Sequence, residues 1–326
     1  MIGMVLRRLA VLPVVLLAIY TLTLALAWAA PGNPVDRPEG RRPPQAVIDA
    51  MERQYNLDSF PRFYVSYLES ASGVRWVRDR LAGPVDPQRP IFDLGPSLQY
   101  EDRRVNEILA DSLPVSMTLG ASAILIATLI GVGAGVIGAL RPGSFADGAS
   151  LALAMVGISL PSFVTGAVLI LIFGVWLGWL PVGGGGTIGQ LVLPAVTLSL
   201  PFAAYIARLT RMGMIEQLSS DHVRAARAKG LPEHTVVLRH ALGNALLPVV
   251  SYLGPATAYA MTGSFVVERV FRVPGLGEHF VNSVLNKDLF LLIGAALTFS
   301  FMLVLFNLAV DMIYRWIDPR ITGDRA

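Results

Sequence analysis

Few residues in this sequence are of a kind that performs chemistry. The chain has no cysteine, which excludes disulfides, cysteine-ligated zinc and thiol catalysis. Its four histidines form no His-Glu-x-x-His pair, and we interpret them as surface residues of loops: His222, His234, His240 and His279. No phosphate-binding Gly-x-x-x-x-Gly-Lys-Ser/Thr motif occurs, and the glycine run at 183–186 lacks its lysine. This run is interpreted as a flexible outer turn. We therefore expect no catalytic, metal or cofactor site on this chain.

The most distinctive polar stretch is the basic, alanine-rich segment 221–230. Ser219, Ser220 or Asp221 can cap a helix through Lys229, and Gly230 is placed to end it. Pro232 then suits the first turn of a second helix over 233–247. Two interpretations stay open, a polybasic loop near anionic lipid headgroups or a helix that docks in a groove of another protein. In the second, small residues allow close approach and basic residues meet the rim: Ala225, Ala226 and Ala228, with Arg224, Arg227 and Lys229.

The elements around this segment belong to a membrane protein. Of its 326 residues 54% are hydrophobic and 15% charged, against roughly 25% charged in soluble proteins. Six apolar stretches reach the roughly 20 residues that cross a bilayer as a helix: 9–30, 113–140, 149–177, 190–207, 243–266 and 289–313. The predicted fold class is an all-α integral membrane protein with six transmembrane helices.

The first stretch has a rival interpretation as a secretory signal. Arg7 and Arg8 precede it, and Ala27-Trp28-Ala29 resembles a cleavage site. Its apolar core of about 22 residues exceeds the roughly 7–15 of a signal sequence. This length favours a retained span.

Orientation follows from the basic residues of the short loops. With the N-terminus inside, three fall in the outer segment 267–288 and none in 178–189. Twelve fall in cytoplasmic segments: Arg7, Arg8, Arg141, Arg208, Arg211, Arg224, Arg227, Lys229, Arg239, Arg315, Arg320 and Arg325. Both termini are therefore predicted to be cytoplasmic.

The predicted division of the chain follows from this topology. Residues 1–30 hold the N-terminus and first span, and residues 31–112 form an extracytoplasmic cap domain with helices near 44–52 and around Phe63, Tyr64, Tyr67 and Leu68. We expect the second of these helices to pack on the first or on the membrane surface. Residues 113–316 form a five-helix core that includes a cytoplasmic loop at 208–242, and 317–326 form a cytoplasmic tail.

Polar and proline residues within the spans indicate a pathway. Prolines bend a span, and hydroxyls against lipid are costly. A pore-lining role and ordinary interhelical packing both stay open for these residues: Ser159, Pro161, Ser162, Pro201, Ser251, Tyr252, Thr257, Tyr259, Thr262 and Ser264. Gly131, Gly135 and Gly138 form a stripe that predicts close helix packing. No charged residue lies near the middle of a span, which counts against a self-sufficient secondary carrier.

Several motifs together resemble a known family. Arg224-Ala225-Ala226 followed by Gly230 matches its Glu-Ala-Ala-x-x-x-Gly loop except at the first position. Further matches are 93–97, 160–163, 239–248 and 267–277. The chain resembles the permease subunits of ATP-binding-cassette importers, in particular the dipeptide and oligopeptide branch.

The resemblance implies partners and site residues. It implies a second permease, cytoplasmic ATP-binding subunits that hold ATP and Mg, and an extracytoplasmic binding protein, all at a bacterial or archaeal inner membrane. The implied ATPase-docking residues are Asp221, Val223, Arg224, Ala225, Ala226, Arg227, Ala228, Lys229 and Gly230. The implied extracytoplasmic gate or binding-protein contact comprises Glu268, Phe271, Pro274, Gly275 and Gly277. Relatives of this branch also move nickel chelates, haem or oligosaccharides, and these stay open as alternative substrates.

Overall fold

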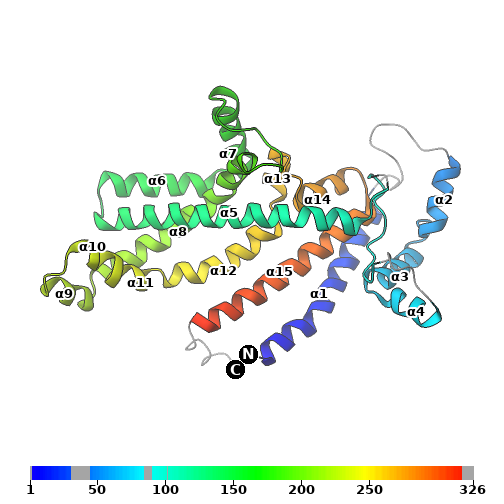
Figure 1. The fold of residues 1–326 in the computed structure, drawn as a ribbon, viewed down its shortest axis with the longest axis horizontal. Helices are drawn as coiled ribbons and strands as arrows, with labels where there is room; N and C mark the ends of the chain where they lie inside the picture. Colours follow the sequence, from blue (N-terminus) through cyan, green and yellow to red (C-terminus); the bar gives the residue numbers. More distant parts are fainter. Residues whose placement is uncertain (1, 31–44, 84–89, 101, 318–326) are drawn as a thin grey trace. The chain divides into compact units, whose positions relative to one another are not determined.

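The computed structural model describes residues 2–30, 45–83, 90–100 and 102–317, and every regular element in these ranges is a helix (Figure 1). Residues 31–44 at the start of the predicted cap domain and the tail at 318–326 lie outside the described residues. The chain divides into two compact units. Unit 1 comprises Met1–Pro114 with Gly275–Met302, and unit 2 comprises Val115–Pro274 with Leu303–Ala326.

Among the described residues, four helices are long and apolar enough to cross a membrane by themselves: α1 (Ile2–Ala29), α5 (Val105–Leu140), α8 (Ile188–Leu218) and α15 (Leu289–Ile317). Two bent pairs raise the number to six if each pair is one span. The all-helical membrane class is therefore confirmed, whereas the six-span arrangement stays a prediction.

The third predicted span, 149–177, is not one bent helix. The helix α6 (Phe145–Ser159) stops, and α7 (Ser162–Leu169) with the π-helix η1 (Ile170–Trp176) continues at an angle of 110°. Leu160 is extended, with φ −82° and ψ 130°. This is the conformation that a following proline imposes, because its ring excludes the helical region for the preceding residue.

The fifth predicted span, 243–266, is also interrupted. The loop-side helices α10 (Glu233–Thr235), η2 (Val236–Ala241) and α11 (Leu242–Ala245) meet α12 (Leu247–Thr262) at a bend of 53°. Gly263 has a φ of +107°, and a separate helix, α13 (Phe265–Phe271), follows. Ser264 therefore caps α13, accepting a hydrogen bond from the Val267 N–H at 3.3 Å, and lies outside the membrane-length helix.

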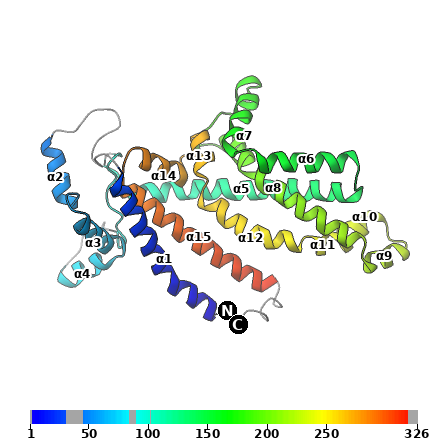
Figure 2. The same ribbon diagram turned by 180° about the vertical axis from the view of Figure 1, so that it is seen from behind.

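Glycines set the spacing of the helices in unit 2, as the stripe in α5 predicted. A Cβ at Gly131 would lie 2.7 Å from the carbonyl oxygen of Ala203, and one at Gly135 would lie 2.6 Å from that of Ala207. Real Cβ atoms do not approach so closely, so α5 and α8 touch backbone to backbone here. Figure 2 shows α5, α6 and α8 running together.

Unit 1 has an aromatic core. Besides α1, this unit contains the helices α2 (Gln45–Tyr55), α3 (Phe60–Ala71), α4 (Val74–Ala82) and α14 (Leu276–Leu285). Tyr20 of α1 stacks on Tyr67 at a centroid distance of 5.6 Å, and its hydroxyl donates to the Tyr64 carbonyl at 2.8 Å. The aromatic face of α3 therefore packs on α1, in a core that Met51 and Tyr55 of α2 also line. Its packing on the membrane surface stays a prediction.

Candidate functional site

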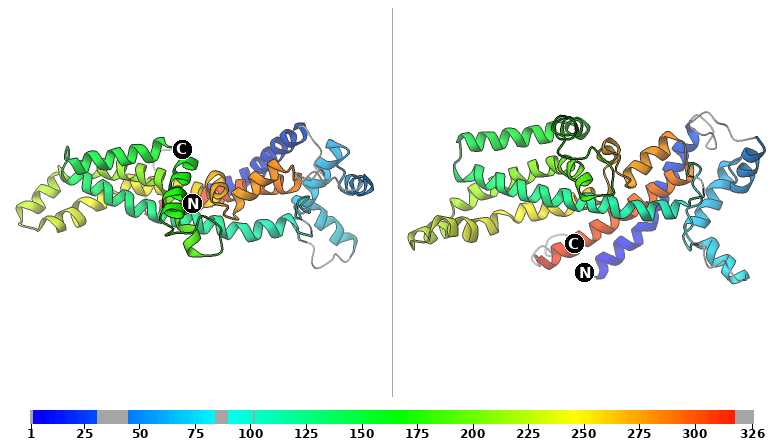
Figure 3. Two further views of the ribbon diagram at one scale, coloured as in Figure 1. Left: turned by 90° about the horizontal axis from the view of Figure 1, so that it is seen from above. Right: turned by 45° about the horizontal axis from the view of Figure 1, so that its top comes forward.

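The predicted helix of the loop is present as α9 (Asp221–Ala228), at the end of unit 2 where α8 and the α10–α11 segment meet (Figure 3). Ser220 is the N-cap, and Asp221 lies in the first turn, where a negative charge favours the helix dipole. At the other end the Leu231 N–H donates to the Ala226 carbonyl and the Gly230 N–H to the Arg227 carbonyl. This is a Schellman ending. It requires the left-handed conformation of Gly230, whose φ is +76°.

One face of α9 is buried in its own chain. Val223 is 0% exposed and Ala226 is 6% exposed. They pack in an apolar cluster, here called the loop core, which draws on α5, α8, η2 and α11: Ala139, Met214, Val236, Val237, Ala241 and Ala245. Motion of α9 is therefore coupled by direct packing to the neighbouring ends of these helices.

The other face of α9 is open. Asp221, Arg224, Ala225 and Ala228 of this face are exposed, as are Lys229 and Gly230 directly after the helix and His222 and Arg227 at the edges of the face. Arg224 forms an ion pair with Asp221 one turn earlier, at 3.4 Å, with both side chains largely exposed. Of the residues assigned to docking from the sequence, Val223 and Ala226 turn inward and only this open face is available to a partner.

Arg227 braces the turn after α9 and does not extend to the rim. Its Nε and Nη2 donate to the two carboxylate oxygens of Glu233, at 3.2 and 2.6 Å. Hydrogen bonding to this carboxylate raises the pKa of Arg227. Because both side chains are about half exposed, the pair orients the turn more than it stabilises the fold. Nothing in the sequence distinguishes Arg227 from its basic neighbours Arg224 and Lys229.

Three of the four histidines lie in the loop region at or near the surface, as interpreted from the sequence, whereas the interpretation of His279 is corrected because it lies half-buried in helix α14, against the ring of Tyr100. His222 and His234 are exposed and His240 is half-buried. The His222 Nε2 lies 3.1 Å from the His240 carbonyl oxygen, a contact that ties α9 to η2. Within the described ranges no three His, Asp or Glu side chains are grouped so as to hold a metal ion.

A buried ion pair fixes the same end of unit 2. Arg211 of α8 donates through Nε and Nη2 to the two oxygens of Asp147, at 2.5 and 2.9 Å. Asp147 is 4% exposed and also accepts from the Gly143 N–H at 2.8 Å. The pair joins the α5–α6 turn to α8. From the sequence, Arg211 contributes only to the predicted topology; its contact with Asp147 has no local signal, because the two residues are 64 positions apart.

The candidate pathway residues lie on α6, α7, α8 and α12, except Pro161, which lies between α6 and α7, and Ser264, which caps α13. On α12, the Thr257 hydroxyl donates to the Leu253 carbonyl at 2.6 Å and the Thr262 hydroxyl donates to the Tyr259 carbonyl at 2.8 Å. These hydroxyls are thus satisfied within their own helix. Others are open in the chain: Ser159, Pro161, Ser251 and Tyr259 are exposed, while Ser162, Pro201 and Tyr252 are half-buried.

The predicted gate segment contains a fully buried carboxylate. Glu268 of α13 is 0% exposed, and its Oε1 accepts from the Ser116 hydroxyl of α5 at 2.9 Å and from the Ser264 N–H at 3.1 Å. Phe271 is also buried, Pro274 is exposed, and Gly275 and Gly277 are buried. The side chain of Glu268 therefore tethers α13 to α5 and does not face solvent.

The glycine run 183–186 packs directly against this segment. The Gly184 N–H donates to the Phe271 carbonyl at 3.1 Å, and a Cβ at Gly183 would lie 2.1 Å from the same oxygen. A Cβ at Gly185 would lie 2.7 Å from Pro274. The expectation of a flexible outer turn is therefore corrected, because the run is packed against α13 and needs glycine for close approach.

The sequence and the fold of this chain both match known proteins. Residues 131–323 match the family described as binding-protein-dependent transport system inner membrane component. The chain belongs to this family. This inner membrane component is a multi-pass helical membrane protein.

Its relatives match along almost the whole chain. It is 42% identical over 325 residues to the oligopeptide transport system permease protein OppB of Escherichia coli K12, covering 98% of this chain and 99% of that one. It is 38% identical over 307 residues to the dipeptide transport system permease protein DppB of Bacillus subtilis, covering 94% and 93%. Among solved structures, the inward-facing MetNI methionine ABC transporter aligns with a TM-score of 0.54 at 20% identity, over 65% of this chain and 97% of that one. The last similarity concerns the fold alone.

Proposed function

We propose that this chain is a permease subunit of an ATP-driven importer for dipeptides or oligopeptides. The proposal is supported by similarity to oligopeptide and dipeptide permeases over nearly the full chain. The chain would contribute half of a translocation pathway, and a second, similar permease would contribute the rest. The absence of charged residues near the middle of the spans suits a wide, wet passage whose recognition is delegated to an extracytoplasmic binding protein.

The single observation that carries the coupling role is the division of α9 into two faces. Its open face carries Ala225 and Ala228 between Arg224 and Lys229, so a partner's backbone can come close while its acidic groups meet the rim. Its inward face, through Val223 and Ala226, is packed in the loop core. Closure of a partner ATPase would thus displace α9 and, with it, the ends of α5, α8 and α11.

The remaining assignments follow from the same role. ATP and Mg would reside on separate ATPase subunits at the cytoplasmic face. Both termini would lie in the cytoplasm, and residues 31–112 on the opposite side, with the Val267–Gly277 region as gate or binding-protein contact. The open residues Ser251 and Tyr259 of α12, with the α6–α7 break at Ser159–Ser162, would face the pathway.

The docking assignment can be tested by filling the open face of α9. We expect Ala225→Trp and Ala228→Trp to prevent the ATPase subunits from co-purifying and to abolish coupled transport, while the chain itself stays folded. Ala50→Trp, at an exposed alanine of α2, is the matched control and should have no effect. ATPase subunits that remain bound to both α9 variants would refute the assignment.

Two further measurements address catalysis and topology. The purified chain alone should show no ATP hydrolysis, and hydrolysis by it would contradict the division of labour. The chain has no cysteine, so an Arg62→Cys variant offers one labelling site. A membrane-impermeant maleimide should label it from the extracytoplasmic side, and labelling only from the cytoplasmic side would overturn the topology.

A further inference from the structure

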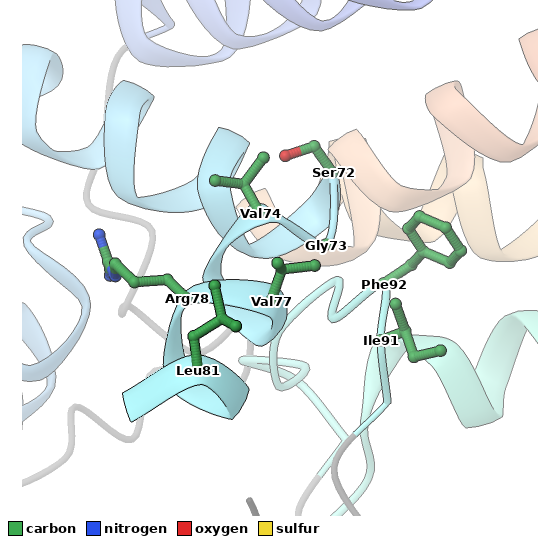
Figure 4. Close-up of a pocket in the computed structure, with 8 residues that line it drawn as sticks. All are labelled: Ser72, Gly73, Val74, Val77, Arg78, Leu81, Ile91 and Phe92. Carbon is green, nitrogen blue, oxygen red and sulfur yellow. The ribbon is translucent and has the colours of Figure 1, made fainter. Parts of the chain in front are cut away.

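An exposed apolar surface in unit 1 has no role in the proposed transport mechanism. Val74, Val77 and Leu81 of α4 are 55%, 50% and 85% exposed. Ile91 and Phe92, which lie in the segment between α4 and α5, are 48% and 60% exposed. These five residues, here called the α4 patch, line an open pocket of about 500 Å³ with Ser72, Gly73 and Arg78 (Figure 4).

Two of the three arginines of α4 lie on either side of this patch. At about 100° per residue, Val74, Val77 and Leu81 form one stripe of the helix, and Arg78 and Arg80 flank it on either side. The Arg78 side chain is 59% exposed although it pairs with Glu69 at 3.0 Å. A short apolar stripe between arginines is the pattern of a helix that lies in the membrane interface, with long cationic side chains extending to the headgroups.

The patch continues into the surface of a membrane-spanning helix. A second cavity, of about 790 Å³, shares Ser72, Val74 and Phe92 with the first. Its other walls come mainly from α1 and α15 and are apolar: Leu12, Leu16, Leu17, Leu297 and Phe301. The α1 stretch Leu6–Ala29 has a mean hydropathy of 2.5, and its outward residues Leu17, Leu22 and Leu26 are exposed. One apolar trough therefore runs from a membrane-spanning helix to α4.

We propose that the α4 patch is a lipid-binding surface, immersed in the membrane leaflet that meets the C-terminal end of α1. Acyl chains fill the trough between α1, α15 and Phe92, and phospholipid phosphates lie against Arg78 and Arg80. Continuity with the lipid-facing surface of α1 selects lipid as the occupant, because a soluble partner would have to displace the acyl chains that already cover α1. The surface fixes α3 and α4 at the bilayer, independently of the transported substrate.

The test is the depth of single nitroxide labels on the full chain in phospholipid nanodiscs. Because the sequence has no cysteine, Val77→Cys and Leu81→Cys each carry one label without background. Leu22→Cys, on the exposed face of α1, is the lipid reference, and Asp58→Cys, whose side chain is 52% exposed, is the aqueous reference. We expect the labels at 77 and 81 to be more accessible to oxygen than to a water-soluble nickel chelate, as at 22 and opposite to 58.

A second variant keeps the test decisive if a label disturbs the helix. Leu81→Asp places a charge at the most exposed patch position, so it should shift the label at 77 towards the nickel chelate without lowering the yield of folded chain. Labels at 77 and 81 with the aqueous signature of 58 would overturn the proposal. Labels that lose nickel accessibility only when a soluble extracytoplasmic protein is added would also overturn it, and would assign the patch to that protein.

Discussion

Replacing Gly120 by alanine tests whether α5 and α12 are held together backbone to backbone. A Cβ at Gly120 would lie 2.3 Å from the carbonyl oxygen of Ala260 and 2.8 Å from the Cα of Met261. Both obstacles are main-chain atoms of α12, so no side-chain rotation can relieve the overlap. To restore an ordinary separation of roughly 3.5 Å, α12 would have to retreat by about 1 Å.

The magnitude combines two opposing effects. Alanine is favoured over glycine in a helix by about 1 kcal/mol. Overpacking of a tight interface costs about 1–3 kcal/mol, and the upper end applies here because the backbone must move. We expect Gly120→Ala to lower the free energy of unfolding by about 2 kcal/mol.

The matched control lies on the same helix. Gly133 of α5 has no atom within 4 Å of its Cβ position, so Gly133→Ala keeps only the helical gain and should raise the free energy of unfolding by up to about 1 kcal/mol. The two variants should thus differ by about 3 kcal/mol, or roughly 6–12 °C in melting temperature at the rate found for domains of this size.

The assay is the thermal stability of the full chain in detergent micelles, followed by transport. Gly120→Ala should also reduce transport, because α12 carries candidate pathway residues and would be displaced. Equal shifts of the melting temperature in the two variants, in either direction, would refute the backbone contact between α5 and α12 at Gly120.

Three further variants test the loop, the buried ion pair and unit 1. Gly230→Ala should destabilise the end of α9 by about 1–2 kcal/mol and weaken ATPase binding, because its φ of +76° strains a side chain although nothing lies within 4 Å. Asp147→Asn should lower the free energy of unfolding by about 1–3 kcal/mol, measured by thermal melting, because Arg211 loses a charged, two-pronged acceptor. Burial, and secondarily Arg103, lowers the pKa of His279 from 6.5. As the pH falls, the unfolded chain therefore takes up this proton at a higher pH than the folded chain does. Stability of unit 1 should be full above pH 6.5 and fall as the pH drops below it, and His279→Gln should flatten this slope in melts over a pH series.

Each of these variants has a comparison that isolates its cause. Gly243→Ala also meets no atom within 4 Å, and Gly243 lies in helix α11 without a positive φ, so it should not destabilise the loop. Asp221→Asn removes an ion pair whose partners are 70% and 96% exposed and should cost less than about 1 kcal/mol. If Gly243→Ala matches Gly230→Ala, or Asp221→Asn matches Asp147→Asn, the strain and burial arguments are wrong. A His279→Gln variant whose stability depends on pH as steeply as that of the parent chain would contradict the argument from the lowered pKa of His279.

The ends of α9 were predictable from the sequence because they depend on local chemistry. Serine before an acidic residue starts a helix, and glycine after a basic turn ends it, whatever lies nearby. Which face of α9 turns inward was not predictable. Val223 and Ala226 are buried by Ala139, Met214 and Val236, which are distant in sequence, and alanines at 225, 226 and 228 look equivalent without them.

The continuity of the predicted spans was likewise not predictable from the sequence. Hydropathy over about 20 residues predicts that a segment is buried in lipid but not that its helix is continuous. At Pro161 the preceding residue leaves the helical region, and at Gly263 the chain turns, so two predicted spans are interrupted where a hydropathy average stays high. The tether from Glu268 to Ser116, across 152 residues, has no local signal at all.

Arg224 stands where the resembled family has an acidic residue, and the geometry of α9 explains how this can be accommodated. Asp221 lies one turn earlier on the same open face and forms an ion pair with Arg224 at 3.4 Å. Residues three apart share a helix face, so the surface offered to a partner still carries one carboxylate and one guanidinium, with the carboxylate displaced by about one turn. Because the pair is exposed and contributes little to stability, either member can exchange its intrachain partner for an opposite charge on a docked protein at small cost. The open face of α9 therefore keeps its mixed charge although Arg224 replaces the acidic residue, and in the proposed docking Asp221 and Arg224 together would set the recognition of the ATPase.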